Sequence, residues 1–392
     1  MSTIELGEWG ADFTANPYPY YAKLRESGPV HHVRMPDGWE FWLVVGHEEG
    51  RAALADPRLV KSPSIVGVTP VDEEVIGPNL LAVDAPDHTR LRKLVTREFT
   101  GRRVEALRPR VQELADELAD AMAPAGRADL VDSFAFPLPI TVICELLGVP
   151  AADRDSFRRW SNELVAPSGG APEREIVEGF GAYLDALIED KRASRPTDDL
   201  LSALITTRAE DGDALSLAEL RGMAYLLLIA GHETTVGLIT NTVRALFAHP
   251  DQLADLRGDF GLIDGAIEEG LRYDGPVESS TFRIAKEAIT VGDTAIPALS
   301  PVFVSLAATD RDPKRFPEPD RFDIRREPRG HLAFGHGIHY CLGAPLARLE
   351  GGIAIRTLLE RFPRLELDPE GAPWEWMPGL LVRGVRRLPV RW

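Results

Sequence analysis

The sequence predicts a mainly α-helical protein with small β-sheets, an α+β fold that forms one domain over residues 1–392. Most segments after residue 86 carry apolar side chains three and four positions apart, which is the spacing of an amphipathic helix. Segments with the alternation of a strand are few and short. No internal repeat, low-complexity tract or Gly/Ser-rich linker divides the chain. One large hydrophobic core is therefore the simplest expectation.

The expected elements follow in order along the chain. The strands cover residues 40–46, 288–297, 301–307 and 380–390, and the helices cover residues 87–99, 104–122, 141–149, 176–193, 198–210, 217–250 and 342–360. The stretch 217–250 is apolar nearly all round, so we expect it to be a buried central helix. Pro345 falls in the first turn of the last helix, where its missing N–H costs nothing.

The amino-acid composition excludes several classes of protein. The net charge of −17 argues against general nucleic-acid binding, because neutralising phosphates needs an excess of Lys and Arg. No run of about 18 apolar residues is free of charges, and the first residues lack the layout of a secretion signal. Two cysteines, Cys144 and Cys341, are too few for a disulfide scaffold. We therefore expect a cytoplasmic protein without a membrane segment, in which Cys144 is a buried apolar filler.

Cys341 stands at or just before the start of the last helix. Free backbone N–H groups and the positive end of the helix dipole favour a thiolate there, so we expect a lowered thiol pKa. Gly335 and Gly337 allow a tight loop in front of the cysteine, of the kind that approaches a bulky group closely. An accessible, stabilised thiolate is a nucleophile or a metal ligand.

Four interpretations of this segment remain open on the residues alone. Cys341 is a buried structural cysteine, a zinc ligand with His336 and His339, the nucleophile of a Cys–His hydrolase, or a thiolate ligand of heme iron. A structural zinc site usually has four ligands, and no further Cys or His pair stands nearby. A hydrolase needs an oxyanion hole and an orienting residue that the sequence does not place.

Basic residues on the helix at 87–99 point in two directions. His88 and Arg92 lie one turn apart on the same arc as Val95, whereas Lys93 and its basic neighbours Arg90 and Arg97 lie on the opposite side. A buried cation is costly unless an anion meets it. His88 and Arg92 therefore predict an internal carboxylate, either of an Asp or Glu elsewhere or of a bound group.

The segment AGHETT, Ala230 to Thr235, interrupts the longest apolar helix with polar residues. Gly231 weakens the helix, and the hydroxyls of Thr234 and Thr235 can bond the carbonyl four residues back and open the turn. We expect a local distortion there.

Phe334 to Gly343, FGHGIHYCLG, matches the heme-binding signature Phe-Gly-x-Gly-x-His/Arg-x-Cys-x-Gly at every fixed position, and the chain resembles bacterial cytochromes P450 of the actinomycete type. The resemblance covers nearly the whole chain and implies heme b (iron protoporphyrin IX) between the long central helix and the Cys loop. Cys341 would be the axial ligand of the iron. The other implied heme contacts are His88, Arg92, Ala230, Arg283, Phe334, Gly335, His339 and Gly343, of which the two histidines and two arginines would bind the propionates.

The family's Ala/Gly-Gly-x-Asp/Glu-Thr motif corresponds to AGHETT, which implies that Glu233 and Thr234 deliver protons during oxygen activation. Glu269 and Arg272 resemble the family's structural Glu-x-x-Arg pair. A non-catalytic heme-binding or sensor protein would have no use for Glu233 and Thr234, and a peroxide-driven enzyme usually lacks such a pair.

The activity that the resemblance implies is that of a heme-thiolate monooxygenase. It would use O2 and electrons from NAD(P)H, delivered by a ferredoxin reductase and a ferredoxin, because no flavin or iron–sulfur segment follows the heme part. An acidic ferredoxin could dock on a basic island in the otherwise acidic chain. The residues proposed for it are Arg90, Lys93, Arg97, Arg102 and Arg103. We expect a monomer.

The substrate is expected to be a large hydrophobic molecule, hydroxylated or epoxidised. GPVESSTFR and LIAGHETTVGLI are similar to actinomycete enzymes that tailor macrolides and other polyketides for antibiotic biosynthesis. Pocket residues implied by the resemblance are Leu81, Val277, Glu278 and Leu380, with Glu278 able to meet a cationic group such as an amino sugar. A terpenoid, steroid, fatty acid or xenobiotic remains the alternative.

Overall fold

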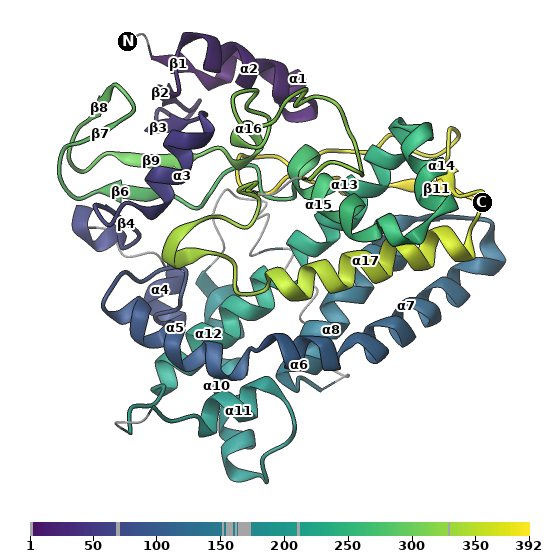
Figure 1. Cartoon of the computed structure of the whole chain (residues 1–392). Helices are drawn as coiled ribbons and strands as arrows, with labels where there is room; N and C mark the ends of the chain where they lie inside the picture. Colours follow the sequence, from purple (N-terminus) through teal and green to yellow (C-terminus); the bar gives the residue numbers. More distant parts are fainter. Residues whose placement is uncertain are drawn as a thin grey trace.

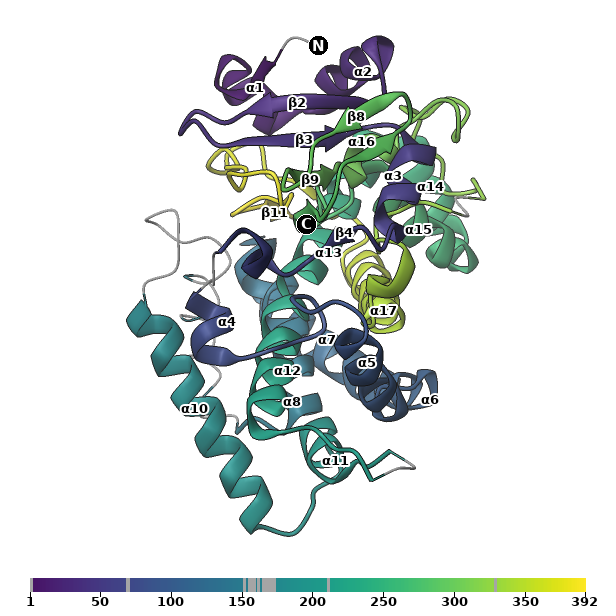
Figure 2. The same ribbon diagram turned by 90° about the vertical axis from the view of Figure 1, so that its left-hand side faces the viewer.

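A computed structural model describes residues 3–67, 71–150, 153, 160, 163, 174–209, 212–327 and 330–392. A mixed β-sheet with short helices forms one end of the molecule, and long helices form the rest (Figures 1 and 2). The mainly α-helical class with small sheets is confirmed. The extent of a single domain, residues 1–392, stays a prediction.

The main sheet joins strands from distant parts of the chain, in the order β1-β2-β3-β9-β6-β4. The strands are β1 (Ile4–Glu5), β2 (Val30–Arg34), β3 (Glu40–Val44), β4 (Leu59–Val60), β6 (Arg283–Ala285) and β9 (Pro301–Val304). β3 pairs with β9 in parallel, Val44 opposite Val304. Two smaller sheets hold β7 (Ile289–Val291) with β8 (Thr294–Ile296), and β5 (Arg127–Asp129) with β11 (Pro389–Arg391) and β10 (Glu366–Leu367).

Sixteen described helices carry α labels. They are α1 (Gly10–Ala15), α2 (Tyr18–Ser27), α3 (His47–Ala55), α4 (Val71–Ile76), α5 (Asp87–Glu98), α6 (Gly101–Ala106), α7 (Arg108–Met122), α8 (Pro137–Leu147), α10 (Arg174–Ala193), α11 (Leu200–Thr206), α12 (Leu217–Ala230), α13 (Glu233–Ala248), α14 (Pro250–Gly258), α15 (Ile263–Asp274), α16 (Leu306–Thr309) and α17 (Ala344–Arg361).

Helix α17 occupies the middle of the helical part and packs against α7, α13 and α15 (Figure 1). Most of its length is buried, although its last turn carries the charged residues Glu360 and Arg361. The α12–α13 stretch, Leu217–Ala248, is long and apolar enough to cross a membrane by composition alone, and 56% of its most apolar window is buried inside the fold. Both stretches therefore behave as core helices.

Several element predictions were wrong in detail, and one is the strand expected over 288–297, which is a hairpin of β7 and β8. The helix expected over 104–122 is two helices that part at Leu107, just before Pro109 at the second position of α7. The helix expected over 217–250 breaks after Ala230. The strand expected over 380–390 is confined to β11, while Val382 and Val385 make only isolated bridges.

Candidate active site

Two glycines shape the loop that carries Cys341. Gly335 and Gly337 have φ values of +72° and +76°, in the left-handed region that other residues rarely adopt. A Cβ atom on Gly337 would also come within 2.9 Å of the Leu54 carbonyl oxygen. The Cys341 N–H donates to the Phe334 carbonyl at 2.9 Å and closes the loop at the start of α17, whose N-cap is Gly343.

The Cys341 thiol is free and its side chain is exposed, although protein surrounds it at longer range. This surrounding protein disfavours the charged form and raises the pKa of the thiol above its ordinary value. The N–H groups of Gly343 and Ala344 act in the opposite direction, as does the Arg92 guanidinium, but their effect is smaller. The expected lowered pKa was therefore wrong, because helix position alone does not account for desolvation.

The other interpretations of the loop have less support. No three His, Cys, Asp or Glu side chains among the described residues lie together as metal ligands, which contradicts a zinc site with His336 and His339. Cys341 has an exposed side chain, so it is not a buried structural cysteine. Cys144, by contrast, is fully buried in the helical core, as predicted.

His88 on α5 and His339 in the Cys341 loop lie side by side, with ring centroids 4.4 Å apart. The His339 ring bonds through Nδ1 to the Leu80 carbonyl oxygen at 3.1 Å, while the buried His88 Nε2 has no hydrogen-bond partner. Burial lowers the pKa of both rings, that of His339 to about 3 with help from Lys61. Both imidazoles are therefore neutral at pH 7, and one offers a free nitrogen.

Three cations belong to the same region. Arg283, on β6, is 4% exposed and, among the described residues, donates only to the Ser280 hydroxyl and the Thr281 carbonyl oxygen. Arg92 is half-buried and acts electrostatically on both His88 and the Cys341 thiol. The third cation, Lys61, was missed from the sequence. Its only sequence signal is a charged residue directly after a short apolar strand.

These residues fit a group that carries two carboxylates. Burial lowers the pKa of Arg283 to about 10, and the Asp84 carboxylate is the only described one that opposes this shift. Unpaired buried cations and an orphaned imidazole nitrogen are costly in an empty interior. The propionates of a heme would relieve both costs.

The junction between α12 and α13 lies at AGHETT. Ala230 is exposed and its neighbours Ile229 and Gly231 are half-buried, so the junction faces open space. The Thr234 hydroxyl donates to the Ala230 carbonyl oxygen at 3.0 Å, the distortion expected from the sequence. His232 is fully buried, with Nδ1 2.8 Å from the Leu228 carbonyl oxygen and Nε2 3.6 Å from Oε1 of Glu233.

One contact places this junction relative to the cysteine. The Thr235 hydroxyl is close enough to the Glu350 carboxyl, which lies on α17, to lower the pKa of that carboxyl. Glu350 is six residues after Ala344, the first residue of α17, which is about 9 Å along the helix axis. The start of α13 is thus held beside the first turns of α17, the helix that Cys341 precedes.

Glu269 and Arg272 form a fully buried ion pair with two contacts of 2.8 Å. Arg272 also donates to three carbonyl oxygens in the segment between α16 and the Cys loop, those of Asp310, Pro319 and Arg321. A surface ion pair makes no such contacts, and this pair fastens α15 to that segment.

The four predicted substrate contacts divide into two groups. Leu81 is exposed, and Val277 and Leu380 are half-buried. Glu278 is 3% exposed and accepts a hydrogen bond of 2.6 Å from the Tyr21 hydroxyl, and its other oxygen is 3.9 Å from Arg383. The expectation that Glu278 faces a substrate was wrong, because residues from both ends of the chain enclose it.

The basic island is smaller than predicted. Arg90 pairs with Asp213 and Glu219, and Arg103 lies about 4 Å from Glu98 and Asp198. Lys93 and Arg102 stay exposed. Arg92 turns only partly inward, since it shares a surface hollow of about 510 Å³ with residues predicted to lie opposite. The lining residues are His88, Thr89, Arg92, Lys93, Thr96, Arg97 and Ile338.

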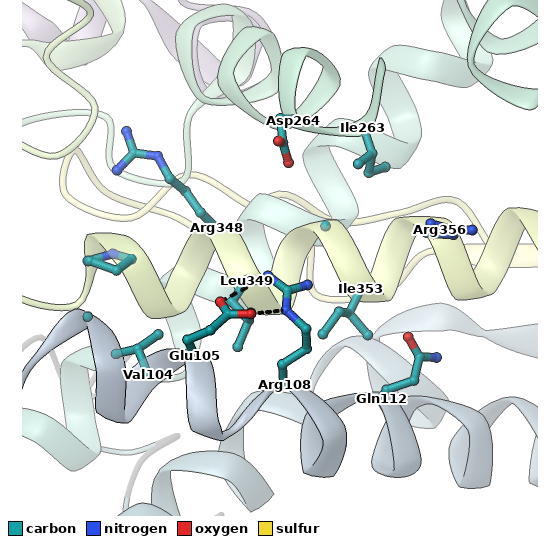
Figure 3. A pocket seen from close by; sticks show the side chains of 13 residues that line it. Val104, Glu105, Arg108, Gln112, Ile263, Asp264, Arg348, Leu349, Ile353 and Arg356 are labelled. Atoms are coloured by element: carbon teal, nitrogen blue, oxygen red, sulfur yellow. Dashed lines mark hydrogen bonds and ion pairs between the residues drawn. The ribbon is translucent and has the colours of Figure 1, made fainter. Parts of the chain in front are cut away.

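A second hollow, of about 310 Å³, lies where α6 and α7 meet α15 and α17 (Figure 3). Its arginines already have carboxylate partners: Arg108 pairs with Glu105, Arg356 with Glu360 and Arg348 with Glu268. None of the predicted site residues lines it.

Comparison with known proteins agrees with this geometry. The family model Cytochrome P450 matches residues 171–388. The chain is 56% identical over 393 aligned residues to Cytochrome P450 monooxygenase PikC of Streptomyces venezuelae, covering 99% of this chain and 94% of that protein. It is 46% identical to 6-deoxyerythronolide B hydroxylase of Saccharopolyspora erythraea, with 97% and 96% covered. The solved structure of the tirandamycin C-bound P450 monooxygenase TamI gives a TM-score of 0.88 at 43% identity, with 99% of each chain covered.

The chain therefore belongs to the cytochrome P450 family and is a P450 monooxygenase, an oxidoreductase. The family implies a heme cofactor, which the residues around Cys341 fit.

Proposed function

We propose that the protein hydroxylates or epoxidises a macrolide or related polyketide in the cytoplasm, using O2 and electrons from a ferredoxin. The exposed Cys341 thiol, in the same region as cations that form no ion pair among the described residues, is the observation that carries the heme-thiolate part of this proposal. The names of PikC, 6-deoxyerythronolide B hydroxylase and tirandamycin C-bound TamI support the substrate class.

Each group of residues has a distinct role in the proposal. When bound, heme would supply the iron chemistry that activates O2 for insertion into a C–H or C=C bond. Cys341 would hold the iron, with Phe334, Gly335 and Gly343 shaping the loop around it. Arg92, Arg283 and the two histidines, His88 and His339, bind the propionates.

The α12–α13 junction supports the oxygen side of the site. Ala230 leaves room there because its side chain is a single methyl group. The Thr234 hydroxyl holds a proton at Oγ1, and Glu233 exchanges protons with it through water. Glu269 and Arg272 maintain the fold beneath the loop, and Leu81, Val277 and Leu380 bound the substrate space.

A ferredoxin would dock on the surface around the hollow that Arg92, Lys93 and Arg97 line. Lys93 and Arg102 supply exposed positive charge there, and the exposed Ile338 supplies apolar surface. Such a face suits an acidic, transient partner. We propose that the protein acts as a monomer with NAD(P)H as the ultimate electron donor.

The decisive experiment is a spectrum of the reduced protein with carbon monoxide. We expect the red-shifted Soret band of a thiolate-bound heme, and we expect Cys341→Ser to lose it. A wild-type protein without that band would refute the heme-thiolate site. Spin-state titration with macrolides, terpenoids and fatty acids then tests the substrate class, which fails if macrolides produce no shift and another class does.

A further inference from the structure

Lys61 is a buried lysine without an ionic partner. Its side chain is 4% exposed, and it directly follows β4. The ammonium donates to the Phe282 carbonyl oxygen at 3.1 Å and to the Thr281 hydroxyl. Both acceptors are uncharged, and no carboxylate in the described part of the chain lies within ion-pair distance of it. An ammonium has three N–H donors, so one is left for a further acceptor.

Its surroundings make this lysine costly. Arg283 is buried nearby and lowers the pKa of the Lys61 ammonium further, after burial itself. The neighbouring Asp84 carboxylate is occupied, because it accepts hydrogen bonds from the backbone N–H groups of Lys61 and Ser62. Like charges that share a buried site require a compensating anion.

A count of formal charges shows how much anion is missing. Lys61, Arg92 and Arg283 contribute three positive charges, and Asp84 contributes one negative charge. The count takes the imidazoles of His88 and His339 as uncharged. Two positive charges remain, which is the number that two ionised propionates would neutralise. Without Lys61, one of the two propionate charges would have no positive charge to neutralise it.

We propose that Lys61 is a propionate-binding residue, a third cation that acts with Arg92 and Arg283 to hold the heme. This inference rests on the proposed heme site and extends it to a residue on the segment between β4 and α5. Lys61 also donates a hydrogen bond to the Phe282 carbonyl oxygen, directly before β6. It therefore links heme binding to the strand that carries Arg283.

The test compares Lys61→Met with Lys286→Met, which removes an exposed lysine from the adjoining segment. In the holoprotein, Lys61→Met should release heme to an apomyoglobin trap about tenfold faster, the effect of losing one charge-assisted hydrogen bond. It should also shift the midpoint potential of the heme to a more negative value, because reduction adds an electron where a positive charge was removed. The control should change neither.

Lys61→Arg keeps the charge and should restore the potential of the wild type, whereas a purely structural lysine would give no such rescue. Lys61→Gln gives a second neutral variant if Lys61→Met does not fold. Wild-type release rates and potentials in a folded neutral variant would overturn the proposal, while the carbon monoxide band of the wild type would still support the heme site. A wild type without that band would instead refute the heme site itself.

Discussion

Glu350 is a carboxylic acid buried inside the helical core. It is 1% exposed, and neither of its oxygens has a hydrogen-bond partner, although the Thr235 hydroxyl is near enough to act on it. Burial outweighs the opposing effect of Thr235 and raises the pKa of the carboxyl well above its ordinary value. The folded protein therefore favours the protonated form of Glu350 more than the unfolded chain does.

This protonation makes the stability of the fold depend on pH. The unfolded chain ionises Glu350 above about pH 4.3, so folding takes up a proton above that pH. The contribution of Glu350 is fully present below that pH and is lost as pH rises toward the folded-state pKa. The Glu350→Gln side chain cannot ionise. As pH rises, the free energy of unfolding of this variant relative to the wild type should therefore increase by up to about 1.4 kcal/mol per pH unit.

Thermal unfolding of the holoprotein between pH 5 and pH 8 measures this difference. The glutamine amide, itself unpaired, would displace the whole curve without changing its slope. Glu360→Gln, on the exposed face of the same helix and paired with Arg356, is the matched control. A difference between Glu350→Gln and the wild type that stays constant with pH would contradict the assignment.

Residue-level prediction from the sequence succeeded where the chemistry is local. Cys341 and the glycines before it are identified by their spacing alone. Glu278 was placed wrongly, because its direction depends on Tyr21, 257 positions earlier. Lys61 was missed because its partners Thr281 and Phe282 lie just before β6, more than 200 positions later. Neither contact leaves a pattern near the residue itself.

At the scale of elements, the break between α12 and α13 depends on Gly231. A Cβ atom there would lie 2.4 Å from the Leu227 carbonyl oxygen and 3.0 Å from the Ile143 side chain. The backbone carbonyl cannot move without disturbing the end of α12. Glycine is therefore needed at this junction because neighbouring atoms approach its Cα closely, and not only because glycine has a low helix propensity.

Gly231→Ala should reduce the free energy of unfolding by about 1–3 kcal/mol, the usual cost of overpacking. Chemical denaturation of the holoprotein checks this value. Gly179→Ala is the control, because Gly179 lies inside α10 with open space around its Cα, where alanine should stabilise by up to about 1 kcal/mol. Equal effects of the two substitutions would rule out the steric explanation.

The elements show what periodicity can and cannot predict. Helices α5 and α10 begin and end close to the expected residues, since each has a clear apolar stripe. The stretch 380–390 is rich in strand formers but is mostly irregular. Its carbonyl groups and side chains bond to α13, α15 and the N-terminal segment instead, as in the contact between Asn241 and the Arg383 carbonyl oxygen.

At the scale of the molecule, Arg383 joins the two ends of the chain. It is 4% exposed and donates to the Asp274 carboxylate at 2.6 Å. It also donates to the carbonyl oxygens of Thr14 and Ala15 at 3.0 and 3.1 Å. The N-terminal helices are thus fastened to α15 through a residue near the C-terminus.

Arg383→Met should cost about 3–5 kcal/mol, because it leaves the Asp274 carboxylate buried without its principal partner. The pKa of Asp274 is held at about 2 chiefly by Arg383 against burial, so it should rise in the variant. Unfolding by denaturant gives the stability, and limited proteolysis reports whether α1 and α2 are released first. Arg386→Met, at an exposed arginine, should stay within about 0.5 kcal/mol of the wild type.

The global arrangement was predictable only in part. The fold class follows from the helical spacing and from the signature around Cys341. The order of strands in the main sheet does not, because β3 pairs with β9 through a register that no local pattern encodes. The proposed heme-binding residues lie on β6, α5 and the Cys341 loop, and their arrangement depends on that pairing.

The pairing of Val44 with Val304 also has a consequence for synthesis of the protein in the cell. At about 5–20 residues per second, a ribosome needs roughly 13–50 s to add the residues between these two partners. During that time β3 has an open edge that can pair with another nascent chain. Slow translation or scarce chaperones should therefore lower the yield of soluble enzyme more than the stability of the finished fold would suggest.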